Sequence, residues 1–154
     1  MKNNLYPTNE RSYLSSKKHK GIAVCPECHL VFQNGKWAKT KLPDKEYYYH
    51  MCPACKRIKD GYFGGILNIK TNLLETKKEE IMNLIKNKES QAQVSNPLRR
   101  VGKIEEINKD EMVVYTTFEH LATSIGKALK SAYKGNLEIQ YRENEKSARI
   151  YWTK

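Results

Sequence analysis

The chain has 154 residues, with 28 Lys and Arg against 17 Asp and Glu, so its formal net charge is +11. This length allows one modest hydrophobic core, or two small cores joined by a connector. No run approaches the about 18 apolar residues of a membrane-spanning helix, and the first residues lack the apolar stretch of a secretory signal. We therefore expect a cytoplasmic protein without a membrane partner. Its charge is typical of chains that bind a polyanion, usually nucleic acid, although a merely basic surface is the alternative.

Residues 1–20 carry five basic side chains and one acidic one. They offer too little apolar surface to offset the entropy lost on ordering, so we expect a flexible basic arm. Tyr6 and Tyr13 add rings that can stack on bases. The alternative is a tail without a function. The candidate RNA contacts of the arm are Arg11, Lys17, Lys18 and Lys20.

The four cysteines form two Cys-Pro-x-Cys pairs separated by 23 residues: Cys25, Cys28, Cys52 and Cys55. A two-residue spacing lets a tight turn direct both thiolates at one tetrahedral ion, so two such pairs predict a zinc site. Four sulfur ligands leave no position for water, and we expect the zinc to be structural. A redox pair normally comes singly beside a βαβ pattern, and disulfides are rare in a reducing compartment. His29 and His50 lie nearby, but the cysteines already complete the coordination shell.

Residues 21–70 form the predicted zinc-ribbon module, with short strands over 21–24, 30–32 and 47–50 between turn signals. Eight basic residues and four acids lie in this range. The candidate RNA contacts of the module are Lys36, Trp37, Lys39, Lys41, Lys56, Arg57 and Lys59.

Residues 71–95 are predicted to form an amphipathic helix. Leu74, Ile81, Leu84 and Ile85 recur at helical spacing and form one stripe. The pair Asn96-Pro97 ends the helix, because the residue before a proline avoids the helical conformation. We expect this helix to connect two modules and to rest its apolar stripe on one of them.

Residues 96–154 predict a small C-terminal module, which makes the chain a member of the α+β class. Strands are expected over 111–117, 137–142 and 148–152, with a further one over 100–107, and a helix over 118–133. The order is ββαββ, an antiparallel sheet with one helix on its inner face. The outer face would expose Gln140, Arg142, Arg149 and Tyr151. That face is a candidate nucleic-acid platform, or an ordinary solvated face, since Glu138 lies in the same row.

Motifs for catalysis are absent from the sequence. It contains no HExxH, GxSxG, GxxxxGKS/T or GxGxxG, and no H-x-E accompanies a cysteine pair as a zinc deaminase requires. His120 lies at a strand-to-helix junction, where a surface or capping role is the simpler interpretation. We therefore expect no enzymatic activity and no small-molecule substrate.

Several segments resemble a family of small, mostly uncharacterised bacterial zinc-ribbon proteins. The likeness covers residues 20–152 and is carried by both cysteine pairs, Gly35-Lys36-Trp37, residues 96–100, and the pattern TT…HLA…IG.AL..AY.G over 116–135. This family is distantly similar to the zinc-binding part of the eukaryotic and archaeal adaptor that exports large ribosomal subunits. The resemblance implies RNA or ribosome association by analogy. The present chain is far shorter than that adaptor and has one four-cysteine cluster, so export is not implied.

Together these features predict a cytoplasmic, zinc-stabilised RNA-binding protein. It would associate with the ribosome, through ribosomal RNA and ribosomal proteins, as a stress or hibernation factor. The alternative is a zinc-ribbon adaptor or transcriptional regulator that binds a protein partner or DNA, although no recognition-helix motif supports DNA. A thiol redox sensor is a third hypothesis.

Overall fold

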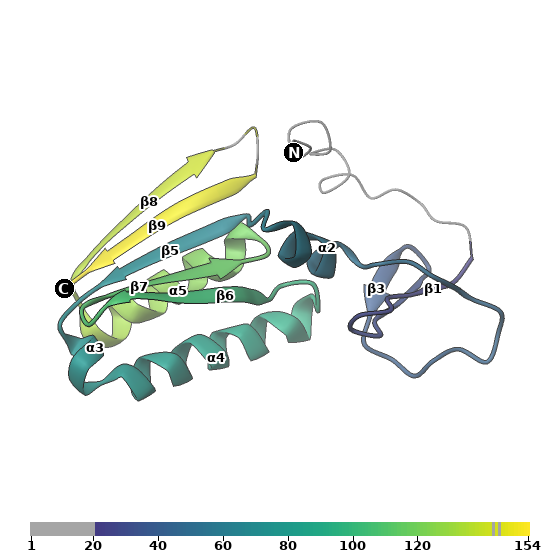
Figure 1. Cartoon of the computed structure of the whole chain (residues 1–154), viewed down its shortest axis with the longest axis horizontal. Helices are drawn as coiled ribbons and strands as arrows, with labels where there is room; N and C mark the ends of the chain where they lie inside the picture. Colours follow the sequence, from purple (N-terminus) through teal and green to yellow (C-terminus); the bar gives the residue numbers. More distant parts are fainter. Residues whose placement is uncertain (1–20, 143, 145) are drawn as a thin grey trace. The chain divides into compact units, whose positions relative to one another are not determined.

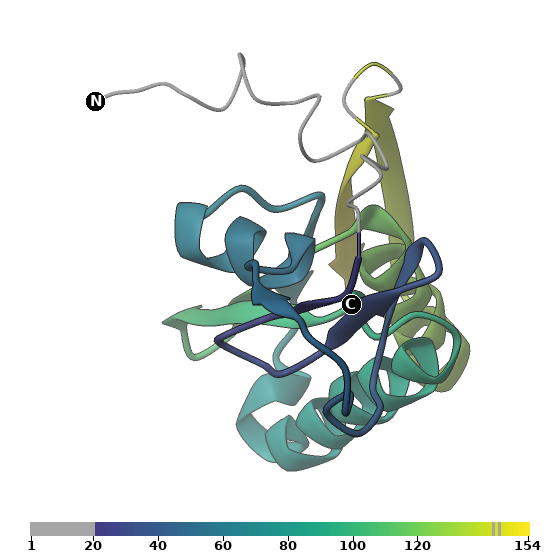
Figure 2. The same ribbon diagram turned by 90° about the vertical axis from the view of Figure 1, so that its right-hand side faces the viewer.

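The computed structural model describes residues 21–142, 144 and 146–154 and divides the chain into two units (Figures 1 and 2). The first unit ends at Tyr62 and the second begins at Phe63. The basic arm expected over 1–20, with its candidate RNA contacts, lies outside the described residues. Within the described residues, no helix combines the length and the apolar character that crossing a membrane requires.

The first unit contains a small four-stranded sheet and one helix. Its elements are β1 (Ala23–Val24), β2 (Val31–Gln33), β3 (Lys36–Ala38), β4 (Tyr48–Tyr49) and α2 (Pro53–Asp60). The strand order is β3-β2-β1-β4, and only β4 runs parallel to its neighbour. Asn34 and Gly35 join β2 to β3 with φ angles of 56° and 82°, the left-handed pair that a two-residue hairpin turn needs. Strands are confirmed near all three expected ranges: those over 21–24 and 47–50 are shorter, and the one over 30–32 is shifted by one residue.

The second unit contains a five-stranded sheet with helices against one face (Figure 1). Its strands are β5 (Gly65–Lys70), β6 (Val101–Asn108), β7 (Glu111–Thr116), β8 (Asn136–Arg142) and β9 (Ser147–Thr153). Its helices are α3 (Leu73–Thr76), α4 (Lys78–Ser95) and α5 (Glu119–Tyr133). The strand order is β6-β7-β5-β9-β8, antiparallel except where β5 pairs with β9.

Period-two alternation explains the core of the second unit. In β9, Ala148, Ile150 and Trp152 are buried and Arg149 is exposed. The buried side chains meet the apolar stripe of α5, which consists of Leu121, Ile125 and Leu129. Trp152 is fully buried, and its indole N–H donates to the Lys134 carbonyl at 2.7 Å, which satisfies its one polar group.

The boundary expected at residue 70 was wrong. Residues 65–70 form β5, the central strand of the second sheet, which pairs with β7 on one side and β9 on the other. The helix expected over 71–95 is broken into α3 and α4, and α4 does not join the two units. Its Ile81 and Ile85 are buried in the core of the second unit. The chain thus passes from β5 through α3 and α4 to β6, a crossover within one unit.

The expected ββαββ module is not confirmed, although the α+β class is. Residues 96–154 contain β6, β7, α5, β8 and β9 in the predicted order. The hairpins β6–β7 and β8–β9 do not pair with each other, because β5 lies between them. A β-sheet edge left unpaired would expose its N–H and C=O groups, and β5 satisfies two such edges at once. Because β5 and β9 are parallel, the sheet is mixed.

Replacing Ile85 tests whether α4 belongs to the second unit. Ile85 is 1% exposed, so Ile85→Ala should lower the free energy of unfolding by about 2–5 kcal/mol. Urea unfolding followed by Trp152 fluorescence, in a Trp37→Phe background, reports on this unit alone because the chain has 2 tryptophans. Val94 on the same helix is 88% exposed, and Val94→Ala should change that free energy by less than about 0.5 kcal/mol. Similar effects of the two substitutions would contradict the assignment.

Candidate metal centre

The four cysteines of the first unit lie together as a cluster. Their Sγ atoms all lie within 4.8 Å of one another, and the Sγ atoms of Cys28 and Cys52 are 3.6 Å apart. Four sulfurs bound tetrahedrally at about 2.3 Å from a zinc ion lie about 3.8 Å from each other. The cluster of Cys25, Cys28, Cys52 and Cys55 can therefore hold one metal ion, as the spacing predicts.

A tight turn between β1 and β2 supplies the first two sulfurs. Cys25 directly follows β1, and its N–H donates to the Leu30 carbonyl at 2.9 Å. The N–H of His29 donates back to the Cys25 carbonyl at 2.9 Å. His29 has a φ of 67°, and this left-handed residue returns the chain toward β2. Both thiols of the pair consequently stand on the same turn.

The start of α2 supplies the other two sulfurs. Cys52 is the N-cap of this helix, and its sulfur accepts a hydrogen bond from the Cys55 N–H at 3.4 Å. Pro53 occupies the first helical position, where its lack of an N–H costs nothing. Thiolate charge is stabilised at a helix N-terminus by the unpaired N–H groups and the helix dipole. Gly61, with a φ of 68°, ends the helix.

Pairing between β1 and β4 brings the two turns together. The N–H of Tyr48 donates to the Ile22 carbonyl at 3.1 Å, and that of His50 donates to the Val24 carbonyl at 3.0 Å. Residues 48–50 therefore run alongside residues 22–24, and each segment leads into one cysteine pair. Two strands of two residues each are too short to be stable alone. A metal ion shared by Cys25 and Cys52 would join the same two segments covalently.

The environment of Cys25 favours its thiolate. Burial raises the pKa of the Cys25 thiol, but hydrogen bonds from the backbone N–H groups of Cys52, Cys28 and Glu27 outweigh it, and the pKa is lowered from 9.0 to about 7. The thiolate is the form that binds metal. Backbone hydrogen bonds thus favour the metal-binding form of Cys25 even when no ion is bound.

The apolar core around this cluster is small. Its largest members are Phe32 and Trp37, whose ring centroids lie 5.3 Å apart, and the His50 ring lies 6.5 Å from Trp37 at an interplanar angle of 20°. Its other buried apolar side chains are Ala23, Val24, Leu30, Val31 and Ala54. His50 and His29 are exposed, and within the described residues the metal-ligating cluster contains cysteines alone.

Two of the expected RNA contacts are buried, and we remove them from the candidate surface. Trp37 is 9% exposed because it packs on Phe32, so its ring is not available for stacking on a base. Arg57 is 2% exposed, and its guanidinium lies 5.4 Å from the centre of the Tyr62 ring. Arg57 was expected on a solvated surface, but it lies on the buried side of α2.

The remaining lysines of the first unit are solvent-accessible. Lys56 is half-buried and pairs with Asp60 at 3.9 Å. Four others are exposed and form no ion pair with any described residue: Lys36, Lys39, Lys41 and Lys59. Lys36, Lys39 and Lys41 lie on what we call the β3–β4 segment, residues 36–49. The exposed Lys45 lies on the same segment and joins the candidate RNA contacts, although it was not among the residues expected from the sequence.

The exposed tyrosine and tryptophan rings among the described residues of the unit are Tyr48 and Tyr49, not Trp37. Tyr49 is 66% exposed, and its ring packs edge-on against Tyr47 with centroids 5.7 Å apart. The run Tyr47-Tyr48-Tyr49 was visible in the sequence. Both tyrosines of the two-residue strand β4 are exposed and Tyr47 is half-buried, a difference that the sequence did not predict.

The candidate contacts of the C-terminal module lie in the second unit, on the sheet face opposite the buried side chains of β9. Arg142 and Arg149 are exposed and Tyr151 is half-buried. In the register of the sheet, Arg149 pairs with Gln140, and Tyr151 pairs with Glu138. Charges of both signs therefore share this face. These residues belong to a different unit from the cysteines.

Removal of the metal should unfold the first unit and spare the second. Binding of structural zinc contributes about 10–16 kcal/mol in small domains, far more than this core can replace. Titration with a chelator should therefore shift the Trp37 emission of the wild-type protein to longer wavelength. The Trp37→Phe variant, which reports only Trp152, should show no shift. An unchanged wild-type spectrum after complete metal removal would contradict a structural role.

Single substitutions distinguish ligands from neighbours. Cys52→Ser should abolish stoichiometric metal binding and the native emission of Trp37. His29→Ala and His50→Ala should each retain one metal ion per chain, because neither ring belongs to the cluster. Metal content after gel filtration, measured by mass spectrometry, decides the question. Loss of the ion from either histidine variant would mean that the ligand set is wrong.

Comparison with known protein families, with curated proteins and with solved structures gave no match to this chain. The resemblance to bacterial zinc-ribbon proteins therefore stays a prediction from the residues, and the metal centre rests on its own geometry.

Proposed function

We propose that this chain is a zinc-stabilised RNA-binding protein that associates with the ribosome in the cytoplasm, as a stress or hibernation factor. One observation carries the proposal. The β3–β4 segment of the first unit presents exposed lysines that form no ion pair with any described residue, next to the exposed ring of Tyr49. The cysteine cluster lies in the same unit.

Zinc is the metal that suits this cluster. Four thiolates in a tetrahedron are typical of structural zinc sites, and they leave no coordination position for a substrate or water. When bound, the ion would crosslink the turn after β1 to the start of α2. Backbone N–H groups near Cys25 and Cys52 stabilise the thiolates. Pairing of β4 with β1 fixes the C-terminal end of the lysine-bearing β3–β4 segment.

The distribution of charge favours the first unit as the RNA-binding part. Residues 1–62 contain 12 Lys and Arg against 5 Asp and Glu, whereas residues 63–154 contain 16 against 12. A zinc ion with four thiolates adds a net charge of −2, which reduces the formal charge of +11 to about +9. The excess remains large. Much of RNA affinity comes from phosphate contacts made by such side chains.

The chemistry of the β3–β4 segment fits a single strand of RNA. Lys36, Lys39, Lys41 and Lys45 are spaced along ten residues and can reach successive phosphates. Tyr49 offers one aromatic face to an unpaired base, and stacking of this kind contributes about 1–3 kcal/mol per base. Ribosomal RNA exposes many unpaired bases, and the family resemblance and the basic arm support this partner over others.

Substitution of two lysines should weaken RNA binding without unfolding the protein. We expect Lys39→Ala with Lys41→Ala to reduce affinity for a single-stranded RNA about tenfold and to lower the salt slope of log K by about 1.4. Fluorescence anisotropy over a range of KCl concentrations measures both. Lys77 and Lys109 pair with Glu80 and Glu75, so their double replacement by Ala is a control with the same charge change. Equal losses from both pairs would show that only net charge matters.

Ribosome association is tested by sedimentation of a cell lysate through a sucrose gradient. The protein should migrate with ribosomal particles in low salt and dissociate partly in moderate salt, because its contacts are ionic. The Cys52→Ser variant should remain at the top. If the wild-type protein also stays at the top at both salt concentrations, ribosome association is excluded. Migration with a protein complex that survives nuclease would favour the adaptor alternative.

A further inference from the structure

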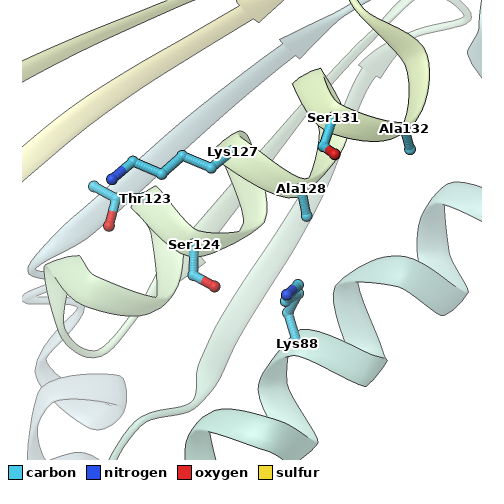
Figure 3. Close-up of a pocket in the computed structure, with 7 residues that line it drawn as sticks. All are labelled: Lys88, Thr123, Ser124, Lys127, Ala128, Ser131 and Ala132. Carbon is cyan, nitrogen blue, oxygen red and sulfur yellow. The ribbon is translucent and has the colours of Figure 1, made fainter.

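A groove runs between α4 and α5 in the second unit, whereas the cysteine cluster belongs to the first unit. It consists of two adjoining hollows that share Lys88 and Ser124. The larger holds about 540 Å³, where a water molecule takes about 30 Å³, so it has room for more than a single small ion. Figure 3 shows its lining, with Lys88 on α4 facing Ala128 on α5.

The groove exists because the contact between the two helices changes along α4. Ile81 and Ile85 are buried against the core, but the next residue on the same stripe is Lys88. Most of the α5 residues that line the larger hollow have small side chains: Ser124, Ala128, Ser131 and Ala132. Thr123 and Lys127 of α5 also line it. Small residues opposite a lysine leave space between the helices that apolar side chains would otherwise fill.

Positive charge in this groove is not neutralised by the protein. Lys88 and Lys127 line the larger hollow and Arg99 lines the smaller, and neither hollow is lined by an Asp or a Glu. Lys127 and Arg99 form no ion pair with any residue that the structure describes. Four lysines elsewhere in the unit do have carboxylate partners, such as Lys78 with Glu106 and Lys109 with Glu75. Unopposed cations around a recess attract anions.

Hydroxyl and amide groups supply further donors beside these cations. Ser124 and Ser131 lie on the α5 side of the groove, and Gln91 lies on the α4 side. The Lys88 ammonium donates to the Gln91 Oε1 at 3.4 Å, so the amide nitrogen of Gln91 stays available. The Thr123 hydroxyl already donates to the His120 carbonyl at 2.9 Å and adds no donor. Lysine, arginine, serine and glutamine are the side chains that contact phosphate oxygens in nucleic-acid complexes.

We propose that the α4–α5 groove binds successive phosphate groups of one RNA strand. The lining of α5 extends from His120 to Ala132, about 18 Å at 1.5 Å per residue, which is too long for one phosphate group to span. Arg99 lies toward one end, Lys88 and Lys127 toward the middle, and Ser131 toward the other end. No aromatic ring other than the His120 imidazole lines the hollows, so the strand is held by its backbone with little dependence on sequence. This proposal rests on the proposed RNA-binding function and gives the second unit a part in it.

Paired substitutions on the two helices test the proposal in the full-length, zinc-loaded protein. Lys88→Ala with Lys127→Ala should weaken binding of a uridine 12-mer about tenfold and lower the salt slope of log K by about 1.4. The matched control is Lys86→Ala with Lys130→Ala, which removes the same charge from the same helices outside both hollows. Its effect should stay below about threefold. Equal losses of RNA affinity from the two double variants would overturn the proposal that RNA binds in the groove.

A substitution that fills the groove tests whether RNA binding needs its space as well as its charge. Ala128→Leu places a larger side chain opposite Lys88 and leaves every charge in place. It should weaken RNA binding severalfold, and the midpoint of urea unfolding should not change. Sodium tripolyphosphate is the second probe. Amide shifts at Ser124 and Lys127 that saturate with the 12-mer, but not with an equal concentration of tripolyphosphate, support a strand. Saturation by tripolyphosphate alone would mean a small polyphosphate ligand instead.

The outcomes distinguish this proposal from the proposed function. If Lys39→Ala with Lys41→Ala weakens RNA binding while the groove pair and Ala128→Leu do not, the groove is wrong and RNA binding by the first unit stands. If the wild-type protein binds no RNA, both fail. If the groove variants alone lose affinity, RNA binds the second unit and the assignment to the zinc unit is wrong.

Discussion

The first unit depends on the proximity of four sulfur atoms that come from two segments far apart in the sequence. The strands that bring these segments together, β1 and β4, share only two residue pairs. Hydrogen bonds of that number cannot offset the chain entropy of ordering about forty residues. A bound ion changes this balance, because it ties the turn after β1 to the start of α2. The exposed lysines and Tyr49 belong to the same unit, so such a connection would help to fix their positions.

The second unit is built on a different principle. Its central strand, β5, is apolar on one side, and it contacts strands from both C-terminal hairpins. The helices cover the same side of the sheet, so Leu67, Ile69, Ile150 and Trp152 form one core with α5. No metal is needed, because buried apolar area supplies the stability. The two units have separate cores, so we expect that a change that unfolds one need not unfold the other.

Local signals predicted most of the elements and the clustering of the four cysteines. Cysteine spacing identified all four sulfurs, because the geometry of a two-residue turn depends on the neighbouring residues alone. Strict alternation predicted β8 and β9, and the 3.6-residue repeat predicted α5. The same signals failed for β3 and α2, which are short, and for the role of β5. Its sequence GILNIK is compatible with a strand anywhere, and only pairing with β7 and β9 fixes its unit. Burial of Trp37 and Arg57, and the α4–α5 groove, likewise depend on contacts between distant residues.

The parallel pairing of β5 with β9 has a consequence for the order in which the chain can fold during synthesis. β5 is the first strand of its sheet to be made and β9 is the last, yet they are neighbours, so the sheet cannot close until β9 has been made. Contacts of such long sequence separation form slowly. The cysteine cluster, by contrast, is complete once residue 55 has been made. The first unit, which ends at Tyr62, can therefore fold while the rest of the chain is still being translated, and the nascent protein would carry an ordered basic surface before its larger unit exists.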